Sequence, residues 1–92
     1  MQATHYKPAD QINLAYRCSD TDATLALWED ITYDVALLID QQFHADSFAL
    51  VDLQEWVEEA ADDLLDRGQY HVTMPRLARH TARMYSLTRR DS

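Results

Sequence analysis

Glycine and proline are scarce in this chain, which has one glycine and two prolines among 92 residues. A turn-rich β fold uses these residues at its many turns, so their scarcity favours long helices. Apolar residues still make up 47% of the chain, which is enough for a folded core. A chain of this length forms one domain. We expect residues 1–92 to be a single small helical domain with short flexible termini at about 1–7 and 91–92.

Cysteine is almost absent too. Cys18 is alone, which excludes an intrachain disulfide and a cysteine zinc site built from one chain. The first seven residues lack the apolar core of a signal peptide. The longer apolar clusters are interrupted by Asp and Glu, so we expect no membrane contact. Together these features predict a cytoplasmic protein.

Lysine is nearly missing, and the charge balance is strongly acidic. Lys7 is the only lysine beside seven arginines, and 16 acidic residues against 8 basic ones give a net charge of −8. Such a molecule repels free nucleic acid as a whole. We therefore predict no strong direct binding to nucleic acid.

Motifs that carry chemistry are missing as well. The four histidines form no HxxxH or HExxH metal pattern, and no serine lies in a GxSxG turn. A single glycine cannot make a phosphate-cradling loop. The sequence thus predicts no enzyme activity, no catalytic residue, no cofactor and no metal site.

Four segments show secondary-structure patterns. Residues 8–18 are read as a short helix, although the alternation of apolar residues from Ile12 to Cys18 also fits a strand. Residues 22–44 carry an apolar stripe at helical spacing that includes Trp28, after N-cap candidates at 19–22.

The third segment, residues 52–67, is expected to begin at a capping box formed by Asp52 and Glu55, or earlier, at Asp46 or Ser47. Gly68 follows where a left-handed cap is expected. The apolar face of this helix should be among the most buried parts of the chain, and its residues are Leu53, Trp56, Val57, Ala60 and Leu64.

The fourth segment, residues 74–90, begins after a plausible N-cap at Thr73 and has Pro75 in its first turn. Its inward stripe is predicted to run from Met74 to Thr88 and to include Met84.

These segments predict an all-α fold, a compact bundle of three to four helices in which the stripes of Trp28 and Trp56 face each other. The alternative is an α+β fold with a short two-stranded element from segments 12–18 and 69–74. The apolar stripes are wide for so small a chain, so we also expect a homodimer whose twofold partner covers part of them.

Charge is segregated between the last two segments. Residues 46–66 hold eight carboxylates and no cation, whereas residues 68–90 hold five arginines and no carboxylate. On the third segment, one row about 16 Å long consists of Glu55, Glu59, Asp62 and Asp66. On the fourth, the outward stripe includes Arg76, Arg79 and Arg83. These seven residues are the predicted partner-binding site. The simpler interpretation is a solvated acidic face and arginines that pair with it, within or between chains.

The acidic row also admits a metal interpretation. Glu55-x-x-Glu58 and Glu59-x-x-Asp62 resemble the ExxE and ExxD carboxylates with which small all-helical nucleotide pyrophosphohydrolases of the MazG type hold Mg²⁺. That resemblance implies that Glu29, Asp30 and Asp34 lie opposite. The first such helix has no ExxE here, and no lysine lies nearby to hold phosphate.

Three functions follow from these patterns. The first is a non-enzymatic protein-binding regulator or inhibitor that acts through charged helix faces, for example by acidic charge mimicry of nucleic acid, as in phage, plasmid or anti-defence accessory proteins. Its partner is another protein, for example one with a basic surface. The second is a nucleic-acid-binding regulator that uses the arginine helix. The third is a Mg-dependent pyrophosphohydrolase-like enzyme.

Overall fold

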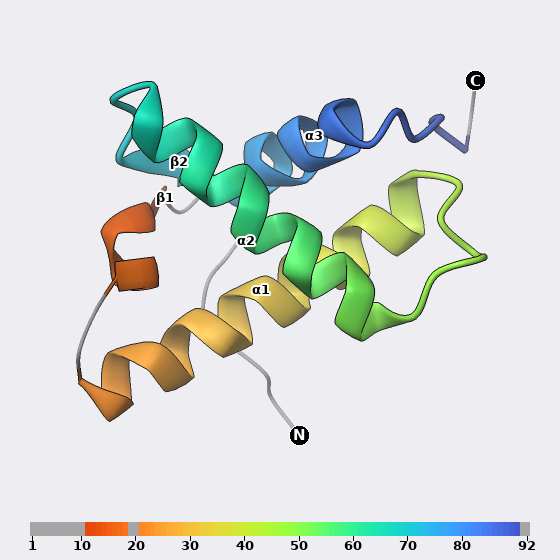
Figure 1. Ribbon diagram of the computed structural model, residues 1–92. Helices are drawn as coiled ribbons and strands as arrows, with labels where there is room; N and C mark the ends of the chain where they lie inside the picture. Colours follow the sequence, from red (N-terminus) through yellow and green to blue (C-terminus); the bar gives the residue numbers. More distant parts are fainter. Residues whose placement is uncertain (1–10, 19–20, 91–92) are drawn as a thin grey trace.

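Three α-helices and a small antiparallel sheet make up the fold in the computed structural model, which describes residues 11–18 and 21–90 (Figure 1). The elements in chain order are β1 (Gln11–Asn13), the 3-10 helix η1 (Leu14–Cys18), α1 (Asp22–Gln42), α2 (Leu50–Asp66), β2 (His71–Thr73) and α3 (Met74–Met84). The predicted bundle of three helices is confirmed. The predicted flexible termini, a helix start at Pro8 and the N-cap candidates at 19 and 20 lie outside the described residues. No helix in the described part is long and apolar enough to cross a membrane.

The two strands confirm the α+β alternative, with shorter limits than predicted. β1 pairs with β2 so that Ile12 lies opposite Val72, and both side chains are buried. The Leu14 N–H extends the pairing by donating to the Tyr70 carbonyl. The prediction of a helix over 8–18 is therefore wrong for residues 11–13. Burying Ile12 and Leu14 while pairing with a distant strand requires the two-residue period, and this tertiary contact overrides helical spacing.

The core is formed by the inward faces of the three helices. α1 contributes Trp28, Ile31, Val35 and Ile39, and α2 packs across it, as the facing stripes predicted. The predicted α2 residues Leu53, Val57, Ala60 and Leu64 are all buried. Trp56 is the exception, since it is only half-buried. It lies at the edge of the stripe, where it packs against the core and its ring also stacks on Tyr85.

α2 begins at Leu50, so the predicted capping box at Asp52 is wrong. Ala49 is the N-cap and makes no side-chain bond. Its carbonyl instead accepts from the N–H groups of Asp52 and Leu53, which places Asp52 inside the first turn, where a negative charge favours the helix dipole. The end of α2 is as predicted. Gly68 has φ = 81°, and its N–H donates to the Leu65 carbonyl.

α3 begins as predicted, with the Thr73 side chain capping it, but ends at Met84 and not near residue 90. Ser86 adopts a left-handed φ of 58°, and the N–H of Leu87 donates to the Ala82 carbonyl, so a serine occupies the usual glycine position of the cap. Met84 and Thr88 were predicted to face inward, but both are exposed. Residues beyond the cap run beside the end of α1, where the Arg90 N–H donates to the Gln42 carbonyl.

The serine cap gives a stability prediction. A left-handed residue with a side chain costs about 1–2 kcal/mol, which glycine avoids in exchange for some backbone entropy. Ser86→Gly should therefore raise the free energy of unfolding by about 0.5–1 kcal/mol. Gly68→Ala is the reverse change, because its Cβ would meet no atom within 4 Å and only the backbone strain is added. Urea denaturation should move the two variants in opposite directions, and a shared direction would refute this account of the caps.

Candidate functional site

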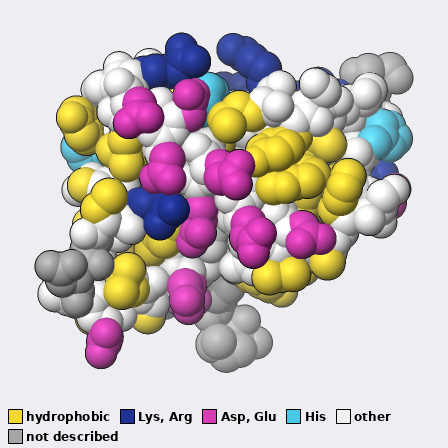
Figure 2. Space-filling model, in the orientation of Figure 1, with side chains coloured by type: hydrophobic (Ala, Val, Ile, Leu, Met, Phe, Trp, Pro, Cys, Tyr) yellow, Lys and Arg dark blue, Asp and Glu magenta, His cyan; other side chains and the backbone are white. Residues whose placement is uncertain are grey.

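The four predicted carboxylates lie together on the outward side of α2. Glu55, Glu59, Asp62 and Asp66 are all exposed, and Figure 2 shows acidic side chains gathered over the middle of this view. Asp62 pairs with Arg17 of η1 at 3.2 Å. Within the described part of the chain, Glu55 and Asp66 make no ion pair. The row therefore keeps much of its negative charge open to a partner.

An aromatic cluster lies beside this row, and we define it as Phe48, Trp56 and Tyr85. The rings of Trp56 and Tyr85 are stacked with centroids 4.2 Å apart and an interplanar angle of 8°. Phe48 meets Trp56 edge-on at 4.7 Å and is 44% exposed. Val51, which lies on α2 like Trp56, is 60% exposed. Figure 2 shows a hydrophobic patch next to the carboxylates, and exposed apolar patches rimmed by polar residues are typical of interaction sites.

A hydrogen bond joins the aromatic cluster to the acidic row. The Tyr85 hydroxyl donates to the Glu59 carboxylate, and this bond raises the pKa of Tyr85 to about 12. Tyr85 is held through its ring, which stacks on Trp56, and through its hydroxyl, which is bonded to Glu59. These two contacts fix the end of α3 against α2. The carboxylate row and the aromatic cluster thus form one surface, which we call the acidic–aromatic face.

The three predicted arginines lie on α3, apart from the acidic row. Arg76, Arg79 and Arg83 are exposed, as predicted. Arg76 donates to the Gln69 side-chain carbonyl. Arg79 and Arg83 form no ion pair with any described residue. The simpler interpretation was that these arginines pair with the acidic helix of the same chain. They do not do so within residues 11–18 and 21–90.

A polar link between α2 and α3 is made by Asp63. Its carboxylate lies 2.8 Å from His80 Nε2 and also accepts from Arg67 Nε at 2.9 Å. These bonds, that of His80 first, lower the pKa of Asp63. The sequence offered no signal for this link, because Asp63 and His80 are 17 positions apart.

Asp63 gives a pH prediction. A carboxylate whose pKa is lowered by folding stabilises the fold above its ordinary pKa of about 4, and that contribution is lost as the pH falls through the lowered folded-state value. Asp63→Asn should therefore lower the urea midpoint at pH 7 and have much less effect near pH 2. Asp66→Asn, which removes a carboxylate that forms no ion pair with any described residue, is the control. An equal loss for Asp63→Asn at both pH values would contradict the assignment.

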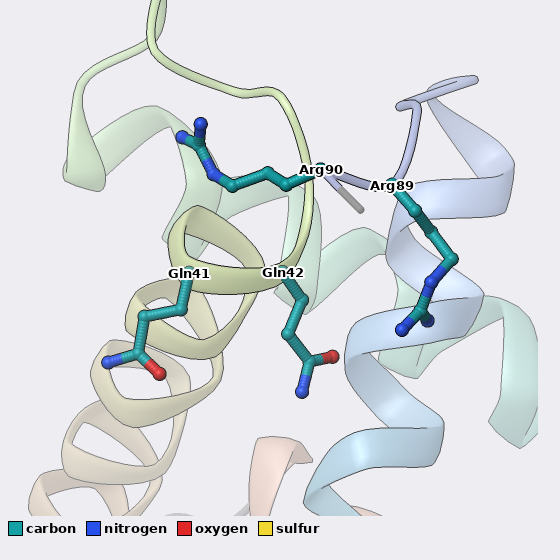
Figure 3. Close-up of a pocket in the computed structure, with 4 residues that line it drawn as sticks. All are labelled: Gln41, Gln42, Arg89 and Arg90. Carbon is teal, nitrogen blue, oxygen red and sulfur yellow. The ribbon is translucent and has the colours of Figure 1, made fainter. Parts of the chain in front are cut away.

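A hollow of about 280 Å³ lies where the chain's end meets α1, lined by Gln41, Gln42, Arg89 and Arg90. In Figure 3 the two guanidinium groups point apart. That of Arg90 donates to the Asp40 carbonyl at 2.9 Å and pairs with Asp46, whose pKa it lowers. Arg89 lies over the Phe43 ring. Both arginines hold the segment after α3 against the end of α1. We therefore assign this hollow a structural role.

The carboxylates compared with MazG-type enzymes do not assemble into a metal site within the described residues, where no three His, Cys, Asp or Glu side chains could hold an ion. Glu55 and Asp66 are unpaired there, Asp62 is bound to Arg17, and Glu59 to Tyr85. The local ExxE and ExxD spacing thus places four carboxylates along one helix, but no three of them gather around one point in the described structure.

The seven predicted site residues do not form one site. The four carboxylates form one surface and the three arginines form another, of opposite charge. Sequence patterns missed Phe48 and Tyr85, whose place beside Trp56 depends on how α3 ends and on the loop before α2. Phe48 fits no predicted core stripe, whereas Tyr85 falls on the predicted inward stripe of residues 74–90, so no sequence pattern pointed to the cluster. No known family model, curated protein or solved structure matches this chain.

Proposed function

We propose that this protein binds another protein through the acidic–aromatic face and acts as a non-enzymatic regulator or inhibitor in the cytoplasm. The observation that carries this proposal is the partly exposed aromatic cluster bordered by carboxylates. Protein interfaces concentrate their binding energy in aromatic residues at the centre of a patch, surrounded by a polar rim. Trp56 and Phe48 supply such a centre, and Glu55 and Glu59 supply the rim.

The chemistry of the face favours a partner with a basic surface. Glu55 and Asp66 are not neutralised within the described residues, and the whole chain carries a charge of −8. This field would steer a basic protein to the face and speed association. Arginine side chains of the partner suit both parts, because a guanidinium pairs with carboxylates and stacks on aromatic rings. A nucleic-acid-binding protein presents such arginines, so occupying its basic surface by charge mimicry is the mechanism that we propose.

The face is also held in place before a partner arrives. Tyr85 is fixed by stacking on Trp56 and by its bond to Glu59. α2 itself is anchored by fully buried side chains such as Leu53 and Val57. A surface that is already ordered loses less conformational entropy on binding, which favours affinity.

A homodimer is a second candidate for the same face. The exposed apolar side chains of Phe48, Val51 and Met84 could be covered by a twofold partner, with the acidic row of one copy against the arginines of the other. Such charge pairing weakens as salt screens it. Light scattering at high micromolar concentration should therefore show a dimer at low salt, and a monomer under those conditions would exclude this assembly.

The protein-binding proposal is tested by affinity capture from a cell extract. The face variant changes Glu55 and Glu59 to glutamine and Asp62 to asparagine. The control removes the same charge from α1, at Asp22, Glu29 and Asp30. Wild type and control should retain the same bound protein, and the face variant should lose it, provided that circular dichroism shows equal helix content. Equal capture by the face variant and wild type would reject the face as the contact surface.

A further inference from the structure

The three exposed arginines of α3 border a small hollow. It has a volume of about 180 Å³ and is lined by Arg76, Arg79, His80 and Arg83. On a helix these positions share one side, and Arg76 and Arg83 are about 10.5 Å apart along the axis. The sequence alone indicated only an outward stripe. The structure adds a concave site in which every lining side chain is basic.

Within the described residues, no carboxylate pairs with the arginines of this hollow. Arg79 and Arg83 pair with no described acidic residue, and Arg76 is held by the uncharged Gln69. The carboxylate that reaches the lining, Asp63, touches His80 and is shared with Arg67. Like charges gathered at a concave surface raise the local concentration of counter-ions. In a molecule with a net charge of −8, such a site is a local exception.

We propose that this hollow binds a compact anion that carries one or two phosphate groups. Arginine's fixed fork of N–H donors matches phosphate oxygens and binds them in pairs. Roughly 10–15 Å³ of such space holds one water molecule, so 180 Å³ accommodates a phosphate group in place of several waters. The hollow is smaller than the roughly 300–1,000 Å³ of pockets for larger ligands.

The size and charge of the whole molecule favour a compact phosphate over a nucleic-acid strand. A strand extends its charges beyond the hollow, where the field of a chain with net charge −8 repels them. A small anion occupies only the local positive field. This site does not depend on the acidic–aromatic face, so either proposal can fail without the other.

Calorimetry with inorganic pyrophosphate at low ionic strength tests the proposal. Wild type should bind with one site, and Arg79→Gln or Arg83→Gln should each weaken binding about tenfold or more, because each removes charged hydrogen bonds to the phosphate. A single-stranded oligonucleotide should bind less tightly than pyrophosphate. Both arginines are exposed, so the variants should keep the helix content of wild type.

Arg89→Gln is the matched control, because it removes one positive charge outside the hollow. It should leave pyrophosphate affinity within about twofold of wild type. The proposal is overturned if pyrophosphate does not bind, if Arg89→Gln weakens binding as much as Arg79→Gln, or if the oligonucleotide binds more tightly than pyrophosphate. The last result would assign the arginines to a nucleic-acid backbone instead.

Discussion

Replacing Phe48 with serine should weaken partner binding about 30-fold or more while leaving the fold intact. Phe48 is 44% exposed and packs edge-on against Trp56, so its ring is available to a partner but contributes little to the core. Aromatic residues at the centre of an interface cost about 2 kcal/mol or more when truncated, and each 1.4 kcal/mol is a factor of ten in affinity. Affinity is measured against the captured partner by calorimetry.

Tyr70→Ser is the matched control for this prediction. Tyr70 is another exposed aromatic, at 55%, but it lies before β2 and outside the acidic–aromatic face. Its loss should change affinity less than twofold. If the Tyr70 variant loses as much affinity as the Phe48 variant, binding reflects general surface hydrophobicity and the proposed face is wrong.

The second large effect concerns the core that positions α2. Leu53→Ala should lower the free energy of unfolding by about 2–5 kcal/mol, since it removes a large side chain from a fully buried site and leaves a cavity. For a small domain this is a large part of a total of about 5–15 kcal/mol. Val51→Ala, two residues earlier on the same helix but 60% exposed, should change stability by no more than about 0.5 kcal/mol.

Urea denaturation followed by circular dichroism compares the two variants. The expected difference between them depends only on which way each side chain faces, because both lie in the first turn of α2. Similar losses for Leu53→Ala and Val51→Ala would mean that α2 is rotated relative to the packing described above. The face built on its outward side would then be misplaced as well.

The buried face of a helix was predictable from the sequence where apolar residues repeat at helical spacing. From Leu53 to Leu64, α2 is apolar on one side and acidic on the other, so the buried face of this helix could be predicted. Gly68 and Thr73 were predictable because a left-handed cap favours glycine and an N-cap favours a short polar side chain.

Other elements were not predictable because their determinants are distant or ambiguous. Residues 11–13 satisfy both helical and strand spacing, and only the pairing with β2 decides between them. The end of α3 depends on Ser86 in a conformation that serine rarely adopts. The partner of Trp56 is Tyr85, 29 positions away, so no local pattern reveals the aromatic cluster. The charge of each helix could be predicted, but it could not be predicted that, among the described residues, the α3 arginines form no ion pair with the carboxylates of α2.

Side-chain footprinting of the captured complex with hydroxyl radicals tests the central claim most directly, because it reports which side chains a partner covers. The acidic–aromatic face predicts that Phe48, Trp56 and Tyr85 lose reactivity in the complex, while Tyr33 and Tyr70, exposed elsewhere, keep it. Protection of Tyr33 or Tyr70 with unchanged reactivity at Phe48 and Trp56 would contradict the proposed contact surface.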